Sequence, residues 1–114
     1  ELIDDDRLTI NFLDAFYSNP SEISDHTAYG FNLIEKTIVK VFNDNDRSVL
    51  TTPYMLMGGT DGRHYERIAE NVYRFNPIKI DSQDLSRIHG INERISVDNY
   101  LNMIRFYYHL IEQI

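Results

Sequence analysis

Residues 50–65 read LTTPYMLMGGTDGRHY, and this stretch decides the fold that the sequence predicts. Leu50–Met57 is rich in apolar and β-branched residues without clean alternation, which favours a strand covered on both faces. Pro53 indicates an edge strand or the start of a strand. A glycine-rich turn, Gly58–Gly62, follows at once and leads into a short helix predicted around His64–Glu70.

The remaining segments continue an alternation of strands and helices. Their patterns predict a half-buried strand at 8–16, a helix from about residue 26 to residue 42, a second short strand at 72–75 and a helix after Ser96. Ser24 or Asp25 is the expected N-cap of the first helix. The fold class that follows is α/β, a sandwich of two or three layers with a mixed, mostly parallel sheet.

The last helix carries the most regular apolar pattern in the chain. Ser96 is its expected N-cap, and apolar residues recur at i, i+3, i+4, i+7 spacing over four turns. These residues are Val97, Tyr100, Leu101, Ile104, Tyr107, Tyr108 and Ile111. The spacing predicts one buried stripe, so we interpret its aromatic residues as core rather than as contacts to a cofactor.

Composition limits the possible partners and chemistry. The 114 residues suit one modest domain, and 18 acidic against 11 basic residues give a net charge of −7, which disfavours nucleic acid as a partner. No apolar run approaches the roughly 18 residues of a membrane span, so no membrane partner is expected. Cysteine is absent, and any metal would therefore be bound by His, Asp or Glu.

The first residues of the chain show no targeting signal. Glu1 stands where an initiator methionine would, and no basic and apolar leader follows it, which predicts a chain that starts partway through a longer protein. The compartment is therefore not encoded in these residues, and the cytoplasm is only the default expectation.

The turn at Gly58–Arg63 joins a predicted strand to a predicted helix, the place where open α/β sheets usually bind ligands. Arg63 offers a planar fork of donors suited to a carboxylate, and Asp61 could orient Arg63 or cap the helix. On spacing alone, a tight turn with a surface ion pair explains the same residues. The turn lacks a terminal Gly-Lys-Ser/Thr, which excludes a phosphate loop of the usual kind.

His89 and Glu93 lie in an irregular stretch just before the last helix. His89 could present an imidazole nitrogen to a metal, although a hydrogen-bonded loop residue is the commoner role of a lone histidine. Glu93 could support a metal ligand, favour the dipole of the following helix or simply be solvated. The other three histidines show no paired spacing typical of a metal site.

Three motifs, taken together, resemble one family. They are PYMLMGGTDGRHY at 53–65, VYRFNP at 72–77 and RIHGINERISV at 87–97. In this order and at these separations they resemble the co-catalytic zinc peptidases and deacylases that include carboxypeptidase S, aminoacylase, acetylornithine deacetylase and succinyl-diaminopimelate desuccinylase. The likeness is greatest to the branch of carboxypeptidase S and the N-fatty-acyl-amino-acid hydrolases.

The resemblance implies a role for each residue that matches a family motif. Arg63 matches the arginine that holds the free carboxylate of the substrate, and His89 matches the C-terminal zinc ligand. Glu93 matches a position beside that ligand, where it would support the ligand rather than act in catalysis. The loop beside the scissile amide, which would shape the substrate pocket or support the arginine, corresponds to Gly58, Gly59, Thr60 and Asp61.

The resemblance also implies a zinc-dependent hydrolase longer than this chain. Family members use two zinc ions to cleave the amide bond of a small peptide or N-acyl amino acid that has a free carboxylate. Most metal ligands and the catalytic glutamate would lie in an N-terminal half that this sequence does not contain, so no residue here is assigned a catalytic role. Because a zinc site needs about three protein ligands, this chain alone should bind zinc weakly and be inactive.

The resemblance finally divides the chain in two. Residues 14–25 resemble the segment that leaves an inserted lid domain, so 1–20 should hold the last strand of the lid and the exit segment. Residues 21–114 should be the C-terminal part of the catalytic domain. The alternative is a non-catalytic carboxylate-binding or assembly module. In either case, strand edges that lack the missing half as a neighbour predict a homo-oligomer or marginal stability.

Overall fold

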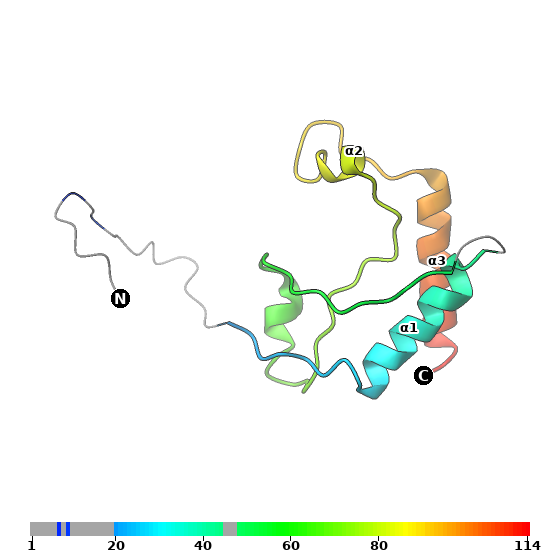
Figure 1. Ribbon diagram of the computed structural model, residues 1–114, viewed down its shortest axis with the longest axis horizontal. Helices are drawn as coiled ribbons and strands as arrows, with labels where there is room; N and C mark the ends of the chain where they lie inside the picture. The colour runs from blue at the N-terminus through cyan, green and yellow to red at the C-terminus, as the bar shows by residue number, and fades with distance from the viewer. Residues whose placement is uncertain (1–6, 8, 10–19, 45–47) are drawn as a thin grey trace.

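The computed structural model describes residues 7, 9, 20–44 and 48–114, and Figure 1 shows how they are arranged. The elements in chain order are the helix α1 (Tyr29–Phe42), the 3-10 helix η1 (Asp61–His64), the short helix α2 (Ser82–Leu85) and the helix α3 (Val97–Ile111). The strand predicted at 8–16 and the exit segment predicted at 1–20 fall almost wholly outside the described residues. Within the described part, none of the helices is long and apolar enough to cross a membrane.

The predicted mixed sheet, and with it the α/β fold class, is wrong for the described part of the chain. Neither 50–57 nor 72–75 forms a strand there, and both run as extended loops in Figure 1. A strand needs a neighbouring backbone about 4.8 Å away to complete its hydrogen bonds. Among the described residues, 50–59 make no backbone–backbone hydrogen bond, and Leu50 and Tyr54 remain 88% and 87% exposed. The apolar run has the composition of a covered strand, but no described segment covers it.

Helix α1 begins three residues later than predicted, because the expected N-cap residues make other hydrogen bonds. The Asp25 carboxylate accepts from the backbone N–H and the hydroxyl of Thr27, both at 2.7 Å, which forms a turn ahead of the helix. Ser24 bonds instead to the backbone of Val72. Ala28 is the N-cap and has no side chain with which to cap. The helix ends before Asn43, as the sequence predicts.

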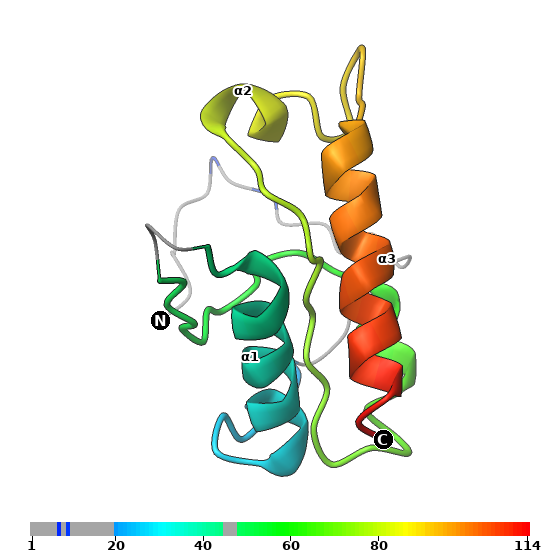
Figure 2. The same cartoon turned by 90° about the vertical axis from the view of Figure 1, so that its right-hand side faces the viewer.

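Helix α3 begins where the sequence predicts. The hydroxyl of its N-cap, Ser96, accepts a hydrogen bond from the N–H of Asn99 at 3.2 Å. Figure 2 shows α3 beside α1, and the two helices pack on each other. The segment 73–80 runs alongside both, because Tyr73 stacks edge-on against Phe31 of α1 and Lys79 exchanges two hydrogen bonds with Asn99.

The core lies where α1, α3 and the segment 73–77 meet. Phe106 of α3 is 2% exposed, and its ring centroid lies 5.2 Å from that of Phe75. Thr37 of α1 is fully buried, and its hydroxyl donates to the carbonyl of Leu33 at 2.7 Å and accepts from the Gln113 amide at 3.0 Å. This buried polar group is therefore satisfied, and its bond with Gln113 joins the segment just after α3 to the middle of α1.

The stripe predicted as the buried face of α3 is exposed, so this prediction is also wrong for the described structure. Val97 and Ile111 are 73% and 70% exposed, and Ile104 between them is 51% exposed. The helix turns Phe106 and the half-buried Met103 inward instead. Helix α3 is apolar around most of its circumference, and α1 together with the 73–77 segment covers only one side of it.

Because Phe106 is the largest fully buried side chain among the described residues, Phe106→Ala should cost about 3–5 kcal/mol of unfolding free energy, enough to unfold a chain of this size. Val97→Ala removes a side chain that is 73% exposed and should change the stability by less than about 0.5 kcal/mol. Urea titration followed by circular dichroism measures both. Equal effects of the two substitutions would contradict the packing described above.

We still expect this chain to self-associate, but for a different reason than the sequence suggested. The exposed apolar stripe of α3, rather than unpaired strand edges, would form the contact between copies. Sedimentation velocity should show a mass that rises with concentration. Ile104→Asp, which places a charge in the middle of the stripe, should return the chain to monomer without changing its helix content. A wild-type chain that stays monomeric at high concentration would contradict this expectation.

Candidate functional site

The glycine-rich turn forms, but as a 3-10 turn rather than the start of a longer helix. Thr60 is the N-cap of η1, and its hydroxyl accepts a hydrogen bond from the N–H of Gly62 at 3.2 Å. Hydrogen-bonded turns follow it, in which Tyr65 accepts from Ile68 and Ala69 through its carbonyl. The helix predicted around His64–Glu70 is therefore replaced by η1 at Asp61–His64 and these turns.

Arg63 projects from this turn as an exposed side chain. Its Nε lies 3.3 Å from Nε2 of the neighbouring His64, and the described residues give it no carboxylate partner. Asp61 sits in the first turn of η1 and does not pair with it. The surface ion pair that spacing alone suggested between Asp61 and Arg63 is thus not formed, and the guanidinium fork faces solvent.

A second arginine, Arg74, forms hydrogen bonds to this turn from a different segment of the chain. This role is not predicted from the sequence. Arg74 donates from Nε to the hydroxyl of Thr60 at 2.8 Å and from Nη2 to the Glu66 carboxylate at 3.0 Å. A Cβ added at Gly62 would lie 2.8 Å from Arg74 Nε, so the guanidinium lies close against this glycine and would have to shift for a larger residue. The only signal in the sequence was the position of Arg74 in the VYRFNP motif.

His89 lies in the loop between α2 and α3, in a backbone conformation that few non-glycine residues adopt. Its φ is 59°, in the left-handed region, and Asn92 three residues on has φ 63°. The turn is closed by the Gly90 N–H, which donates to the carbonyl of Arg87 at 2.8 Å. The imidazole is exposed. A left-handed backbone conformation at a histidine costs local stability.

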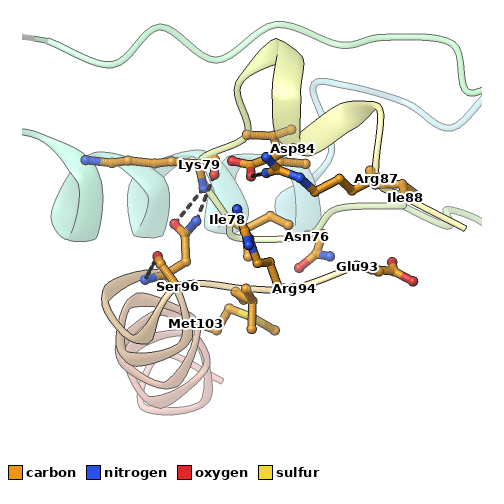
Figure 3. A pocket seen from close by; sticks show the side chains of 13 residues that line it. Asn76, Ile78, Lys79, Asp84, Arg87, Ile88, Glu93, Arg94, Ser96 and Met103 are labelled. Carbon is orange, nitrogen blue, oxygen red and sulfur yellow. Dashed lines mark hydrogen bonds and ion pairs between the residues drawn. The ribbon is translucent and has the colours of Figure 1, made fainter. Parts of the chain in front are cut away.

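Glu93 lines a pocket of about 510 Å³ between α2, the segment 76–80 and the start of α3, shown in Figure 3. Lys79, Arg87 and Arg94 line the same pocket, and Arg87 is paired with Asp84 at 3.0 Å. His89 does not line it. Glu93 therefore lines a pocket that His89 does not, and its side chain points away from the two arginines in Figure 3.

The predicted site residues fall into two separate groups. Gly59, Thr60, Asp61 and Arg63 lie in and just before η1, while His89 and Glu93 lie in the loop after α2. In Figure 1 these two regions stand at different places of the molecule, and no described contact joins them. The described residues thus bring together the residues predicted to bind a carboxylate, but they do not bring His89 and Glu93 to the same place.

A comparison with protein families now decides the assignment. Residues 8–113 match the model of the family described as Peptidase family M20/M25/M40. The chain belongs to this family. The resemblance read from the three sequence motifs is confirmed, and with it the description of the chain as part of a peptidase and amidohydrolase family.

Individual relatives of this M20-family chain are similar along nearly all of it. It is 39% identical to "Probable carboxypeptidase S-like 2" of Dictyostelium discoideum over 97% of this chain and 20% of the relative. It is 40% identical to "N-fatty-acyl-amino acid synthase/hydrolase PM20D1" of Mus musculus over 95% of this chain and 21% of the relative. Carboxypeptidase S of Saccharomyces cerevisiae is 29% identical over 81% and 17%. The chain spans about a fifth of the length of these relatives, and no solved structure matches it.

The described residues of this M20-family chain do not fit a zinc site by themselves. No group of three His, Asp or Glu side chains among them lies close enough together to hold a metal ion. A zinc ion needs about three protein ligands, and His89 would supply one.

Among the described residues, four pKa values are shifted, three of them by local hydrogen bonds and that of Tyr73 by burial. Burial raises the pKa of Tyr73, whose hydroxyl donates to the carbonyl of Asp25 at 2.6 Å. The hydrogen bond from the Tyr108 hydroxyl lowers the pKa of Glu112 and raises that of Tyr108. The pKa of Asp25 is lowered from 3.8, first by the hydrogen bond from the Thr27 hydroxyl and then by that from the Thr27 N–H.

The lowered pKa of Asp25 makes the entry to α1 sensitive to acid. Because the folded state favours the charged carboxylate, its contribution is fully present above the usual value of 3.8 and is lost as the pH falls through the lower folded-state value. Unfolding free energies measured across the acid range should show a weaker pH dependence for Asp25→Asn than for the wild type. Parallel pH profiles for the two proteins would contradict this role.

Proposed function

We propose that this chain carries the carboxylate-binding turn of an M20-family hydrolase that cleaves the amide bond of peptides or N-acyl amino acids with a free carboxylate. The observation that carries the proposal is the exposed guanidinium of Arg63 on a turn that is braced by Arg74. The names of the relatives support the substrate class, since they are carboxypeptidase S-like proteins and N-fatty-acyl-amino acid synthase/hydrolases.

Arg63 suits this role because a guanidinium presents parallel N–H donors that match the two oxygens of a carboxylate. Its described neighbour is the imidazole of His64 at 3.3 Å, a contact that a charged ligand would outcompete. Thr60 and Asp61 fix the conformation of the turn as the N-cap and first residue of η1. Gly59 precedes them and leaves room for a ligand, because a Cβ added there would meet nothing within 4 Å.

We further propose that His89 supplies one ligand of a zinc site whose other ligands lie outside the described residues. Glu93 would act close to this ligand as a charged neighbour. On this proposal, residues 21–114 form part of the catalytic domain, and residues 1–20 join it to an inserted domain. The remaining ligands and the covering of the α3 stripe would come from polypeptide equivalent to the other four fifths of the relatives. This chain by itself should be inactive and bind zinc weakly.

A second candidate function is a carboxylate-binding or assembly module without hydrolysis. It is favoured by one observation, that no group of side chains able to hold a metal ion lies among the described residues. The two candidates share Arg63 and differ in whether His89 matters. A test of the proposal must therefore change these two residues separately.

The test is the hydrolysis of N-acyl amino acids, dipeptides and their C-terminal amides by a polypeptide of family length that contains this chain. Arg63→Ala should raise KM for free-carboxylate substrates about 10- to 100-fold and change the amides little, because charged hydrogen bonds contribute about 1.5–3 kcal/mol. His89→Ala should abolish turnover of both substrate types. Arg67→Ala, which removes another exposed arginine of the same segment, is the matched control.

Each outcome of this hydrolysis test separates the candidates. Loss of turnover in His89→Ala, with a carboxylate-specific defect in Arg63→Ala, supports the hydrolase. Ligand binding without turnover in the wild-type polypeptide would instead support the binding module. Substrate hydrolysis by the 114-residue chain alone would contradict the proposal that its metal site is incomplete.

A further inference from the structure

We propose that Arg74 is the positioning residue of the carboxylate site: it clamps both ends of the segment that carries Arg63 and so fixes the direction of the binding guanidinium. The inference rests on the proposed function of Arg63. Its own support comes from three independent features of the structure, which are the bonds of Arg74, the glycine beneath it and the anchoring of its own segment.

The two bonds of Arg74 reach residues on either side of Arg63. Nε donates to Oγ1 of Thr60 at 2.8 Å, and Nη2 donates to Oε1 of Glu66 at 3.0 Å. Thr60 Oγ1 also accepts the N–H of Gly62, and Thr60 O accepts the N–H of Arg63 at 3.3 Å. One planar guanidinium therefore spans the turn from its N-cap to the residue three positions after Arg63, and holds both ends at a fixed separation.

Gly62 shows that this approach is close. A Cβ at this position would lie 2.8 Å from Nε and 3.4 Å from Cζ of Arg74, and 3.0 Å from Thr60 Oγ1. The first of these distances is too short for a real Cβ contact, so a larger residue would force the end of the Arg74 side chain to shift from its position against the turn. The glycine is needed here for space, since its φ is not in the left-handed region.

The segment that carries Arg74 is itself fastened to the approach to α1. Val72 donates its N–H to Ser24 Oγ at 2.9 Å, and the Ser24 hydroxyl lies 3.1 Å from the Val72 carbonyl. The Asp25 N–H donates to the side-chain carbonyl of Asn71 at 2.6 Å, and the Tyr73 hydroxyl bonds the Asp25 carbonyl. Arg74 thus links the turn at Thr60 to a segment that is hydrogen-bonded to the residues just before α1. Among the described residues, no other side-chain hydrogen bond joins this turn to that segment.

Charge gives the two arginines different roles. Arg74 is neutralised by Glu66, with 25% and 33% of the two side chains exposed, whereas Arg63 is exposed and has no carboxylate partner among the described residues. A substrate carboxylate is therefore directed to Arg63. Arg74 therefore positions the turn that carries Arg63 and does not compete with Arg63 for the substrate carboxylate.

The test measures how well a family-length polypeptide containing this chain distinguishes N-acyl amino acids from their C-terminal amides, as a ratio of kcat/KM values. Arg74→Ala, Thr60→Val and Gly62→Ala should each lower this ratio about tenfold or more, mainly through KM of the carboxylate substrate. Thr60→Ser, which keeps the accepting hydroxyl, should preserve it, and so should the control Arg67→Ala. In the Arg63→Ala background, Arg74→Ala should lower the ratio no further.

The outcomes separate failure of this inference from failure of the proposed function. If Arg63→Ala leaves the ratio unchanged, the proposed carboxylate site is wrong and the role of Arg74 falls with it. If Arg63→Ala lowers the ratio but Arg74→Ala does not, only the inference about Arg74 is overturned. An equal loss of kcat/KM on acids and amides in Arg74→Ala would show a general structural role and would also overturn it.

Discussion

The packing of α3 against α1 is the interaction on which the rest of the structure depends. Phe106 and Phe75 bring the segment 73–77 onto this helix pair, and the hydrogen bond between Thr37 and Gln113 joins α1 to the residues just after α3. Most other segments have few such contacts, and the apolar residues of 50–57 are left in solvent. A chain with so small a core has its order concentrated near these helices.

The side chain of Arg74 connects the candidate carboxylate site to this core. The 71–73 segment is bonded to Ser24 and Asp25 just before α1, and Arg74 follows it directly. From there the guanidinium reaches the turn at Thr60. Arg63 is thus exposed enough to meet a ligand, yet its turn is not a free loop. His89 has no comparable support among the described residues, apart from the turn that places it in a left-handed conformation.

The sequence predicts the two long helices and the family better than it predicts packing. Ser96 caps α3 as expected, but Asp25 bonds to Thr27 instead of capping α1, because an Asx turn competes with a helix cap for the same carboxylate. The apolar run at 50–57 indicates burial, yet a strand also requires a neighbour, which a local pattern cannot supply. A local pattern also could not predict the role of Arg74, because its partners Thr60 and Glu66 lie 14 and 8 residues away in sequence.

The central claim is that Arg63 holds the carboxylate of the substrate. The most direct measurement is a crystal structure of a family-length polypeptide that contains this chain, bound to an N-acyl amino acid analogue that resists hydrolysis. We expect both carboxylate oxygens about 3 Å from the Arg63 guanidinium nitrogens, with Arg74 still on Thr60 and Glu66. A carboxylate bound elsewhere, with Arg63 left in solvent, would contradict the claim.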